Sequence, residues 1–349
     1  VLPLMAPALL AGFALAFVAS LGNFGIPALL GIPARYTTLP VLIWQRMASF
    51  GVGMLEGVAV LAFIMALAAL AAVVVLLIVQ RFGRTALIGP PRQPLAIALG
   101  RARPAVEAGL WAFVAAVLVL PLASLFATAL VRTYGLPLTP ETITFDNFAE
   151  ILFRQSVTLR AFANSTLAAA MAGGLLAGVA VVAAYAMAQR TWASRTAGRA
   201  IEALGDVAYA IPGIVLSIAF ILAFIRPLPL LDVSLYNTLL IIMLAYVTAF
   251  LSVALKPVTA SFAQMDPALD AAARVAGARY GRRLRSIIAP AVAPAMASGA
   301  ILVFLTAYNE ITVSALLWSA GNETIGTTIF NYEDGGYTTL AAAMSAVTV

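Results

Sequence analysis

Long apolar runs separated by short polar segments make up most of the chain. A helix needs about 20 apolar residues to cross a hydrocarbon core of about 30 Å, and seven runs reach or approach that length. The strands of a membrane barrel would instead alternate over about ten residues. The pattern therefore predicts an all-α, polytopic transmembrane helix bundle. The predicted spans are Met5–Leu21, Gly57–Val79, Ala108–Val131, Ser165–Ala188, Val207–Ile225, Thr238–Leu255 and Ala291–Leu317, with an eighth starting near Thr338.

The composition agrees with a protein whose surface faces lipid. Hydrophobic residues make up 63% of the chain and charged residues 10%, whereas soluble domains carry about 25% charged residues. The chain has no Cys and no His, which removes disulfides, thiolate metal ligands and the usual neutral-pH proton shuttle. We therefore predict no metal site, no cofactor and no enzymatic activity in this chain.

The distribution of basic residues predicts the orientation in the membrane. If residue 1 lies in the cytoplasm and the spans alternate, 14 of the 20 Lys and Arg residues fall in the inside segments 80–104, 189–203 and 256–290. An excess of Lys and Arg marks cytoplasmic loops. The net charge of +6 is thus explained by membrane topology, and no nucleic-acid partner is predicted.

Two segments predicted to lie outside are longer than turns. Residues 23–50 are rich in Gly and Pro, and residues 132–164 contain LTPETITFDNFAEIL, which is typical of a short amphipathic helix after a Thr/Pro start. Both segments are compatible with interfacial packing or with a docking surface for an external partner.

The beginning of the chain repeats its end at a shift of 287 residues. The Pro and Gly matches carry the repeat, because Ala and Leu matches are common in so apolar a chain. We predict two homologous halves related by parallel duplication: residues 1–80 end the first half, 81–105 form a cytoplasmic linker and 106–349 form the second half. Both ends are expected to be truncated. The repeat places Pro3, Pro7, Gly12, Leu15 and Phe17 on Pro290, Pro294, Gly299, Leu302 and Phe304.

The predicted cytoplasmic loop MDPALDAAARVAGARYGRRLRSIIAPAVAPA stands out before the seventh span. Pro267 suits the first turn of a helix, Gly277 permits a bend, a basic helix follows from about Arg279, and Pro290 is expected to close it before the membrane. A plain positively charged loop and a short element that docks on a partner both fit this pattern.

This loop resembles the signature loop of permeases of binding-protein-dependent ABC importers. The family motif reads Glu-Ala-Ala, three residues, Gly, nine residues, Ile, one residue, Leu-Pro. The chain departs from it at Ala289, where Leu is usual, and at Ala271, where Glu is usual, with Asp270 just before. The resemblance implies an ATPase-coupling loop carried by Asp270, Ala271, Ala272, Ala273, Gly277, Ile287 and Pro290.

Other segments extend the resemblance over nearly the whole chain. AYAIPGIVLSIAF, DNFAEIL and RAFANSTL are similar to parts of such permease domains, and LGNFGIPALLGIPARYTTLPVLIW looks most like the fused, two-half ferric iron permeases. The resemblance implies a type I ABC importer permease fold in the bacterial inner membrane. Its implied partners are two ABC ATPase subunits and a periplasmic or extracellular substrate-binding protein. The ATPase phosphate loop G-x-x-x-x-G-K-[ST] does not occur in the sequence.

The cargo implied by this resemblance is ferric iron. Thiamine, polyamine, sulfate and phosphonate remain open, because the separate binding protein selects the cargo. An ion-coupled secondary transporter is a competing class, but it would need buried carboxylates, and Asp and Glu are scarce within the predicted spans.

A few polar residues lie near the end of the seventh predicted span, and Asn23 lies at the position that corresponds to Glu310 in the repeat. Charges inside a membrane are costly and invite a functional interpretation. We predict that Glu310 attracts a cation at the outward mouth of the path; a Glu that simply reaches water is the alternative. The predicted path residues are Asn23, Tyr308, Asn309 and Glu310.

Overall fold

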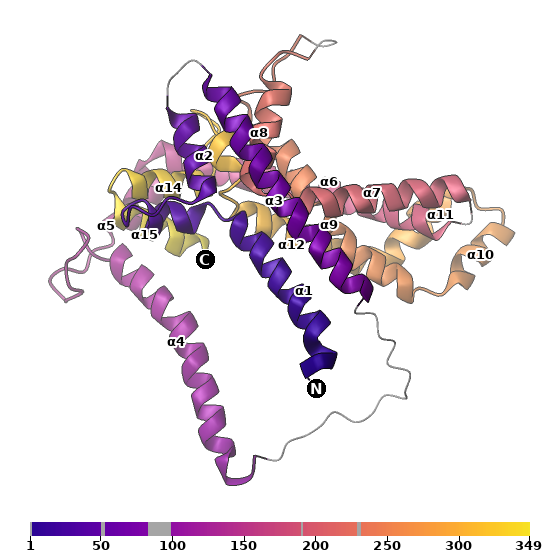
Figure 1. Ribbon diagram of the computed structural model, residues 1–349, viewed down its shortest axis with the longest axis horizontal. Coiled ribbons are helices and arrows are strands. Elements are labelled where there is room, and N and C mark those ends of the chain that lie inside the picture. Colours follow the sequence, from indigo (N-terminus) through magenta and orange to yellow (C-terminus); the bar gives the residue numbers. More distant parts are fainter. Residues whose placement is uncertain (1, 50–52, 83–98, 190, 229–231) are drawn as a thin grey trace. The chain divides into compact units, whose positions relative to one another are not determined.

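A computed structural model describes residues 2–49, 53–82, 99–189, 191–228 and 232–349. The described residues form helices and no strand, apart from one antiparallel bridge between Val131 and Ile143 (Figure 1). Two compact units are present: one comprises Val1–Gly12, Leu77–Leu159 and Ile329–Val349, and the other comprises Phe13–Leu76 and Arg160–Thr328. The predicted all-α bundle is confirmed.

The elements follow one another in a simple order along the chain. They are α1 (Leu2–Leu21), η1 (Pro27–Gly31), α2 (Leu39–Ala48), α3 (Met54–Phe82), η2 (Gly100–Ala102), α4 (Arg103–Ala129), α5 (Asp146–Ala149), η3 (Glu150–Arg154), α6 (Ser156–Ala188), α7 (Trp192–Ala210), α8 (Gly213–Phe224), α9 (Leu239–Gln264), α10 (Pro267–Val275), α11 (Tyr280–Arg283), η4 (Leu284–Ile288), α12 (Ala289–Tyr308), α13 (Ser314–Leu317), α14 (Ile325–Asp334) and α15 (Thr338–Thr348).

Five helical stretches among the described residues are long and apolar enough to cross a membrane. They match predicted spans, and the first predicted span lies within α1. The stretches are Met54–Val75, Gly100–Ala129, Ser156–Ala188, Leu239–Gln264 and Tyr280–Tyr308.

The predicted span Val207–Ile225 is interrupted in the structure. The structure has two helices there, α7 and α8, bent by 110° at a short break. The backbone of Ile211 and Pro212 is extended, with ψ of 127° and 136°. Proline disfavours the helical conformation of the residue before it, and hydropathy does not register that effect.

The predicted span Ala291–Leu317 is also interrupted. The helix α12 ends at Tyr308, and the one-turn helix α13 begins at Ser314. Between them the side chain of Glu310 accepts hydrogen bonds from the backbone, so the chain leaves the helix without losing all its partners.

The helices follow the predicted repeat. Adding 287 to the bounds of α1, Leu2–Leu21, gives 289–308, which are the bounds of α12. The short segments η1 and α13 then follow at corresponding positions. The domain boundaries at 80 and 105 stay a prediction, and residues 83–98 of the predicted linker lie outside the described residues.

The core of the second unit is built where α6, α7, α9 and α12 approach closely (Figure 1). A methyl group on Gly173 of α6 would lie 2.8 Å from the carbonyl oxygen of Ala300, and one on Gly299 of α12 would lie 2.9 Å from that of Ala254. Small residues let membrane helices approach until their backbones touch. Here they place α12 directly against both α6 and α9.

Replacing Gly173 by Leu is expected to destabilise this packing by about 1–3 kcal/mol, because overpacking forces the helices apart. Gly174 is the matched control, since a methyl group there would have no neighbour within 4 Å. Thermal unfolding in detergent should show a lower Tm for Gly173→Leu than for Gly174→Leu. Equal Tm values for the two variants would contradict the close contact.

Candidate functional site

The predicted coupling loop begins with a capped helix. The side chain of Asp266 accepts a hydrogen bond from the backbone N–H of Ala268 at 2.8 Å, and Pro267 occupies the first turn of α10. An Asp at this place satisfies an amide that lacks a helical partner. The helix start predicted at Pro267 is confirmed.

A sharp bend ends this helix at the predicted glycine. Gly277 has φ of +75°, a conformation that costs other residues about 1–2 kcal/mol. Its N–H donates to the carbonyl of Arg274 at 2.9 Å, and the N–H of Ala278 donates to that of Ala273 at 3.0 Å. These two bonds close the C-terminus of α10 in the manner typical of a glycine cap.

The second arm of the loop continues without interruption into a candidate membrane span. The segments α11, η4 and α12 adjoin one another, and Tyr280–Tyr308 forms one candidate span. The prediction that Pro290 closes the loop helix is wrong. Pro290 lies in the first turn of α12, and the backbone of Ile288 and Ala289 just before it is helical, so the arm continues through it. Ile287 lies half-buried in η4 just before it.

The helix α10 has an exposed apolar face and an inward polar face. Ala271 and Ala272 are exposed, as are Leu269 and Val275, the latter at 90% of its accessible surface. Ala273 is buried. The exposed face therefore carries no charge, and it is small enough to lie close to a partner.

The inward face carries a charged cluster around Asp270. Its carboxylate accepts hydrogen bonds from the hydroxyl of Tyr185 at 2.8 Å and from Nε of Arg274 at 2.9 Å. Nε of Arg283 lies 3.2 Å away. Burial alone would raise the pKa of Asp270, but the Tyr185 hydrogen bond and the two guanidinium groups outweigh it and hold the pKa below its usual value. Asp270 is thus charged near neutral pH.

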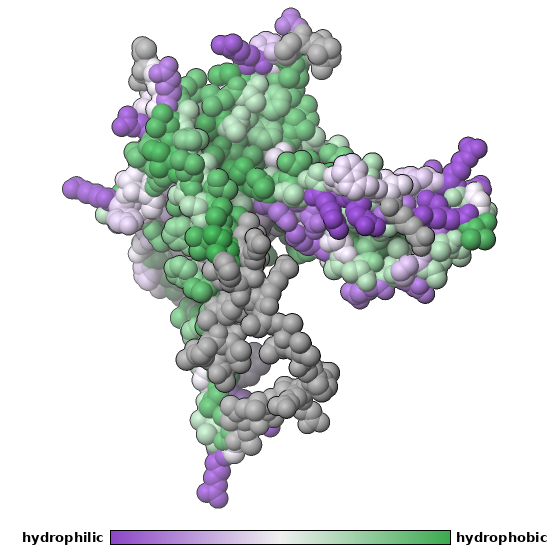
Figure 2. All heavy atoms as spheres, turned by 45° about the vertical axis from the view of Figure 1, so that its right-hand side comes forward, coloured by the Kyte–Doolittle hydropathy of each residue, from purple (hydrophilic) through white to green (hydrophobic). Residues whose placement is uncertain are grey.

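Basic side chains surround the outside of this loop. Figure 2 shows hydrophilic residues gathered over the part of the molecule formed by α7, α10 and α11. Arg279, Arg282 and Arg285 are exposed there. Such a surface suits water and anionic lipid headgroups.

Three of the four predicted path residues line one cavity. Asn23, Asn309 and Glu310 border a space of about 440 Å³. Asn23 follows α1, and the other two follow α12, the helix that matches α1 at the predicted shift of 287 residues. Tyr308 is not among its lining residues and stacks on Phe304 with ring centroids 5.2 Å apart.

The carboxylate of Glu310 also organises the helix break beside this cavity. It accepts hydrogen bonds from the backbone N–H of Val313 at 2.8 Å and of Ser314 at 3.2 Å. The hydroxyl of Ser217, on α8, donates to the carbonyl of Val313 at 2.7 Å. Sequence reasoning missed Ser217, because a lone Ser in an apolar helix gives no signal.

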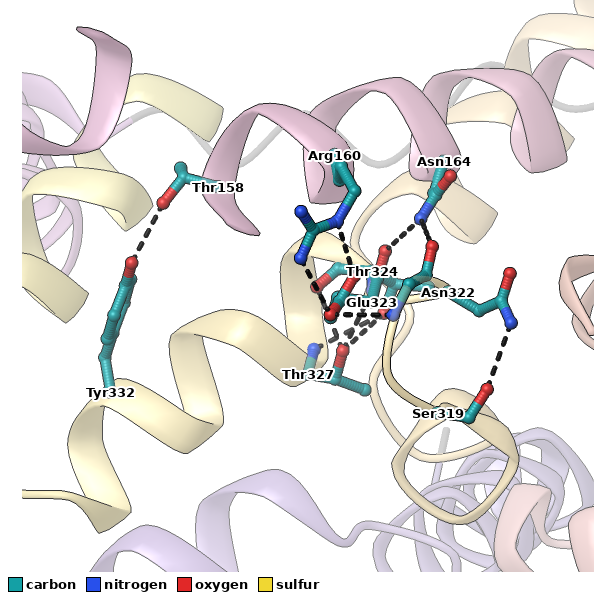
Figure 3. A network of polar contacts seen from close by, with 10 residues as sticks. Thr158, Arg160, Asn164, Ser319, Asn322, Glu323, Thr324, Thr327 and Tyr332 are labelled. Carbon is teal, nitrogen blue, oxygen red and sulfur yellow. Dashed lines mark hydrogen bonds and ion pairs between the residues drawn. The ribbon is translucent and has the colours of Figure 1, made fainter. Parts of the chain in front are cut away.

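A second polar cluster, also missed by sequence reasoning, holds the segment before α14 against α6 (Figure 3). Glu323 is buried; Nη2 of Arg160 lies 3.3 Å from its carboxylate, which also accepts from the N–H of Gly321 at 2.9 Å. Asn164 donates to the backbone carbonyl of Glu323 at 3.0 Å. Burial would raise the pKa of Glu323, but the Gly321 amide and Arg160 together lower it.

Comparisons with known proteins agree with this architecture. The described residues include helices long and apolar enough to cross a membrane and a cavity bordered by a few polar side chains beside a helix break, as expected for a membrane permease. Residues 178–349 match the family described as "Binding-protein-dependent transport system inner membrane component". Residues 178–349 are thus a permease domain of this family, and the chain is a multi-pass protein of the inner membrane.

Similar curated proteins carry transport names. The chain is 28% identical to a probable ABC transporter permease protein of Sinorhizobium fredii, over 60% of this chain and 37% of the relative. It is 29% identical to a trehalose transport system permease protein of Mycobacterium tuberculosis, over 52% of this chain and 62% of the relative. It is 26% identical to a ferric transport system permease protein of Actinobacillus pleuropneumoniae, over 56% of this chain and 28% of the relative. The chain thus covers less than two thirds of each relative's length.

A solved structure shows the same fold. It belongs to a bacterial ABC transporter involved in the import of the acidic polysaccharide alginate, with a TM-score of 0.52 and 16% identity. The match covers 73% of this chain and 94% of the other. It supports the permease fold predicted from the sequence.

The Glu323 cluster predicts a pH-dependent stability difference. A carboxylate whose folded-state pKa is depressed stabilises the fold above its unfolded-state pKa, about 4.3 for Glu, and the stabilisation is lost as the pH falls through the folded pKa. Unfolding of Glu323→Gln should therefore be easier than that of the native chain at pH 7, and the gap should narrow below about pH 4. Glu141→Gln, at an exposed position, is the control. A gap that persists unchanged into acid would contradict the charged cluster.

Proposed function

We propose that this chain is the membrane-spanning subunit of an ATP-driven importer and forms the path for a solute delivered by an external binding protein. The loop of residues 266–290 would couple it to two ABC ATPase subunits. The observation that carries this proposal is the geometry of that loop: an exposed apolar helix, a glycine bend and a continuous helix into the membrane.

The exposed face of α10 supports docking on the ATPase. Its Ala residues allow close approach, and Leu269 and Val275 offer apolar surface that gains from burial. The chain itself hydrolyses nothing in this scheme.

A single helix connects the loop to the cavity. The arm after Gly277 continues as α12 to Tyr308, and the cavity-lining residues Asn309 and Glu310 follow directly. A displacement of α10 by the ATPase would thus be transmitted along one helix to the cavity.

The segments 23–50 and 132–164 are each proposed, separately, to contact the binding protein. Tyr36 of segment 23–50 and Phe153 of segment 132–164 are exposed. Aromatic residues are enriched in the centres of protein interfaces.

Ferric iron is the proposed cargo. The cavity offers the carboxylate of Glu310 and the amide side chains of Asn23 and Asn309, and such oxygen donors suit a hard cation. The ferric relative supports this cargo. The trehalose relative supports a disaccharide as a second candidate, and uptake of labelled Fe³⁺ against labelled trehalose, each with its binding protein, decides between them.

Placing a charge on the exposed face of α10 tests the docking. Val275→Asp should reduce co-purification of the ATPase subunit by roughly tenfold or more, because the complex would bury an unpaired carboxylate. Val233→Asp, at another exposed valine, is the matched control and should retain the ATPase. Equal recovery with both variants would contradict the proposed surface.

Removing the charge of Glu310 tests the cation path. Glu310→Gln keeps the shape of the side chain and one carbonyl acceptor for the helix break, so the fold should persist while Fe³⁺ uptake falls by about tenfold. The measurement is uptake at equal expression, with Glu56→Gln, an exposed position in the first turn of α3, as control. Unchanged uptake would reject a role for Glu310 in the path.

A further inference from the structure

We propose that Asp270 is a positioning residue that fixes the helix α10 against α6 and against the arm that becomes α12, and that it is not part of the surface offered to the ATPase. Its place in coupling rests on the proposed function, whereas the fixed position of α10 does not.

The side chain of Asp270 points away from the exposed face of α10. Successive residues of a helix point about 100° apart. Ala271 and Ala272 face outward and are exposed, while the side chain of Asp270 retains 16% of its accessible surface. Asp270 therefore does not replace the Glu that the family motif has at position 271.

The partners of Asp270 come from three elements. The hydroxyl of Tyr185, on α6, donates to its carboxylate at 2.8 Å, and Nε of Arg283, on α11, lies 3.2 Å from the carboxylate and donates to the oxygen of Tyr185 at 3.0 Å. Arg274, one turn further along α10, also donates to Asp270. The same Arg274 donates to the side chain of Gln189, just after α6, at 3.0 Å. The five side chains thus form one closed network.

The position of α10 depends on this network because little else holds the helix. It has nine residues, and helices shorter than about 12 residues are marginal on their own. Most of its residues are exposed, and Ala273 is the residue of the helix that is buried. Removing the carboxylate would also leave Arg283, 11% exposed, without its charged partner.

The network gives motion at α10 two routes into the membrane. One runs through Gly277 and α11 into α12, and the other runs through Tyr185 into α6. With α10 held on both sides, a push on its outer face moves α6 and α12 together. If Asp270 is replaced by a neutral residue, α10 can rotate about Gly277. A displacement of α10 then rotates the helix and is not transmitted to α6 and α12.

Pairs of spin labels test the position directly. The chain has no Cys, so Trp192→Cys and Val275→Cys, both highly exposed, can be labelled specifically. The distance between the labels is measured by pulsed electron paramagnetic resonance in nanodiscs for the parent, Asp270→Asn and Asp266→Asn. The last is the matched control, because Asn also caps a helix. In the complex with the ATPase, solute imported per ATP hydrolysed is measured for the parent, Asp270→Asn and Asp266→Asn without the two Cys substitutions, because Val275 lies on the proposed docking face.

We expect a narrow distance distribution for the parent and Asp266→Asn and a broad one for Asp270→Asn. The ATPase should stay bound to Asp270→Asn while uptake per ATP falls roughly tenfold, as expected for loss of hydrogen bonds to a charged group. An unchanged distribution in Asp270→Asn overturns the proposal, as does loss of ATPase binding without broadening, which would place Asp270 on the docking surface. If no ATPase binds even the parent chain, the proposed function fails, while the label distances still decide where α10 is held.

Discussion

The close approach of α12 to α6 and α9 is the constraint on which the rest of the second unit depends. Backbone atoms meet at Gly173 and Gly299, with no room for a methyl group. Packed interiors have low compressibility and transmit displacement. Because α12 is also the continuation of the loop arm, the contact joins the loop of residues 266–290 mechanically to the helices that surround α12.

The second constraint is that lipid cannot satisfy a backbone amide or carbonyl. Irregular backbone at membrane depth is tolerated only where protein or a polar cavity supplies partners. The break after Tyr308 meets this requirement through the carboxylate of Glu310 and the hydroxyl of Ser217. The polar groups that permit the break therefore lie beside the cavity, and one residue can serve both the fold and the path.

Much of this organisation could be predicted from the sequence. Apolar run length identifies α3, α4, α6 and α9, and the Pro and Gly spacing of the repeat predicts that α1 and α12 correspond. Pro267 and Gly277 mark the start and the bend of the proposed coupling loop. These signals are local in the sequence, so they can be recognised without knowledge of the fold.

The rest depends on contacts between distant segments. The helix breaks at Pro212 and Asn309 lie within apolar runs, and a hydropathy pattern therefore predicts one uninterrupted span at each place. A proline such as Pro290 can either end a helix or lie in the first turn of one, and the sequence around it does not distinguish these two cases. The network of Asp270 with Tyr185, 85 residues away in sequence, and that of Glu323 with Arg160 have no pattern along the chain.

In the proposed mechanism, ATP-driven movement at the loop reaches the cavity between the ends of α1 and α12. The most direct measurement is the distance between spin labels at Ala19→Cys and Thr306→Cys, two cavity-lining positions, in the assembled transporter without nucleotide and with ATP trapped. Two distinct label distances are expected, one in each state. A single distance in both states, in a preparation that still imports its solute, would contradict the proposed mechanism.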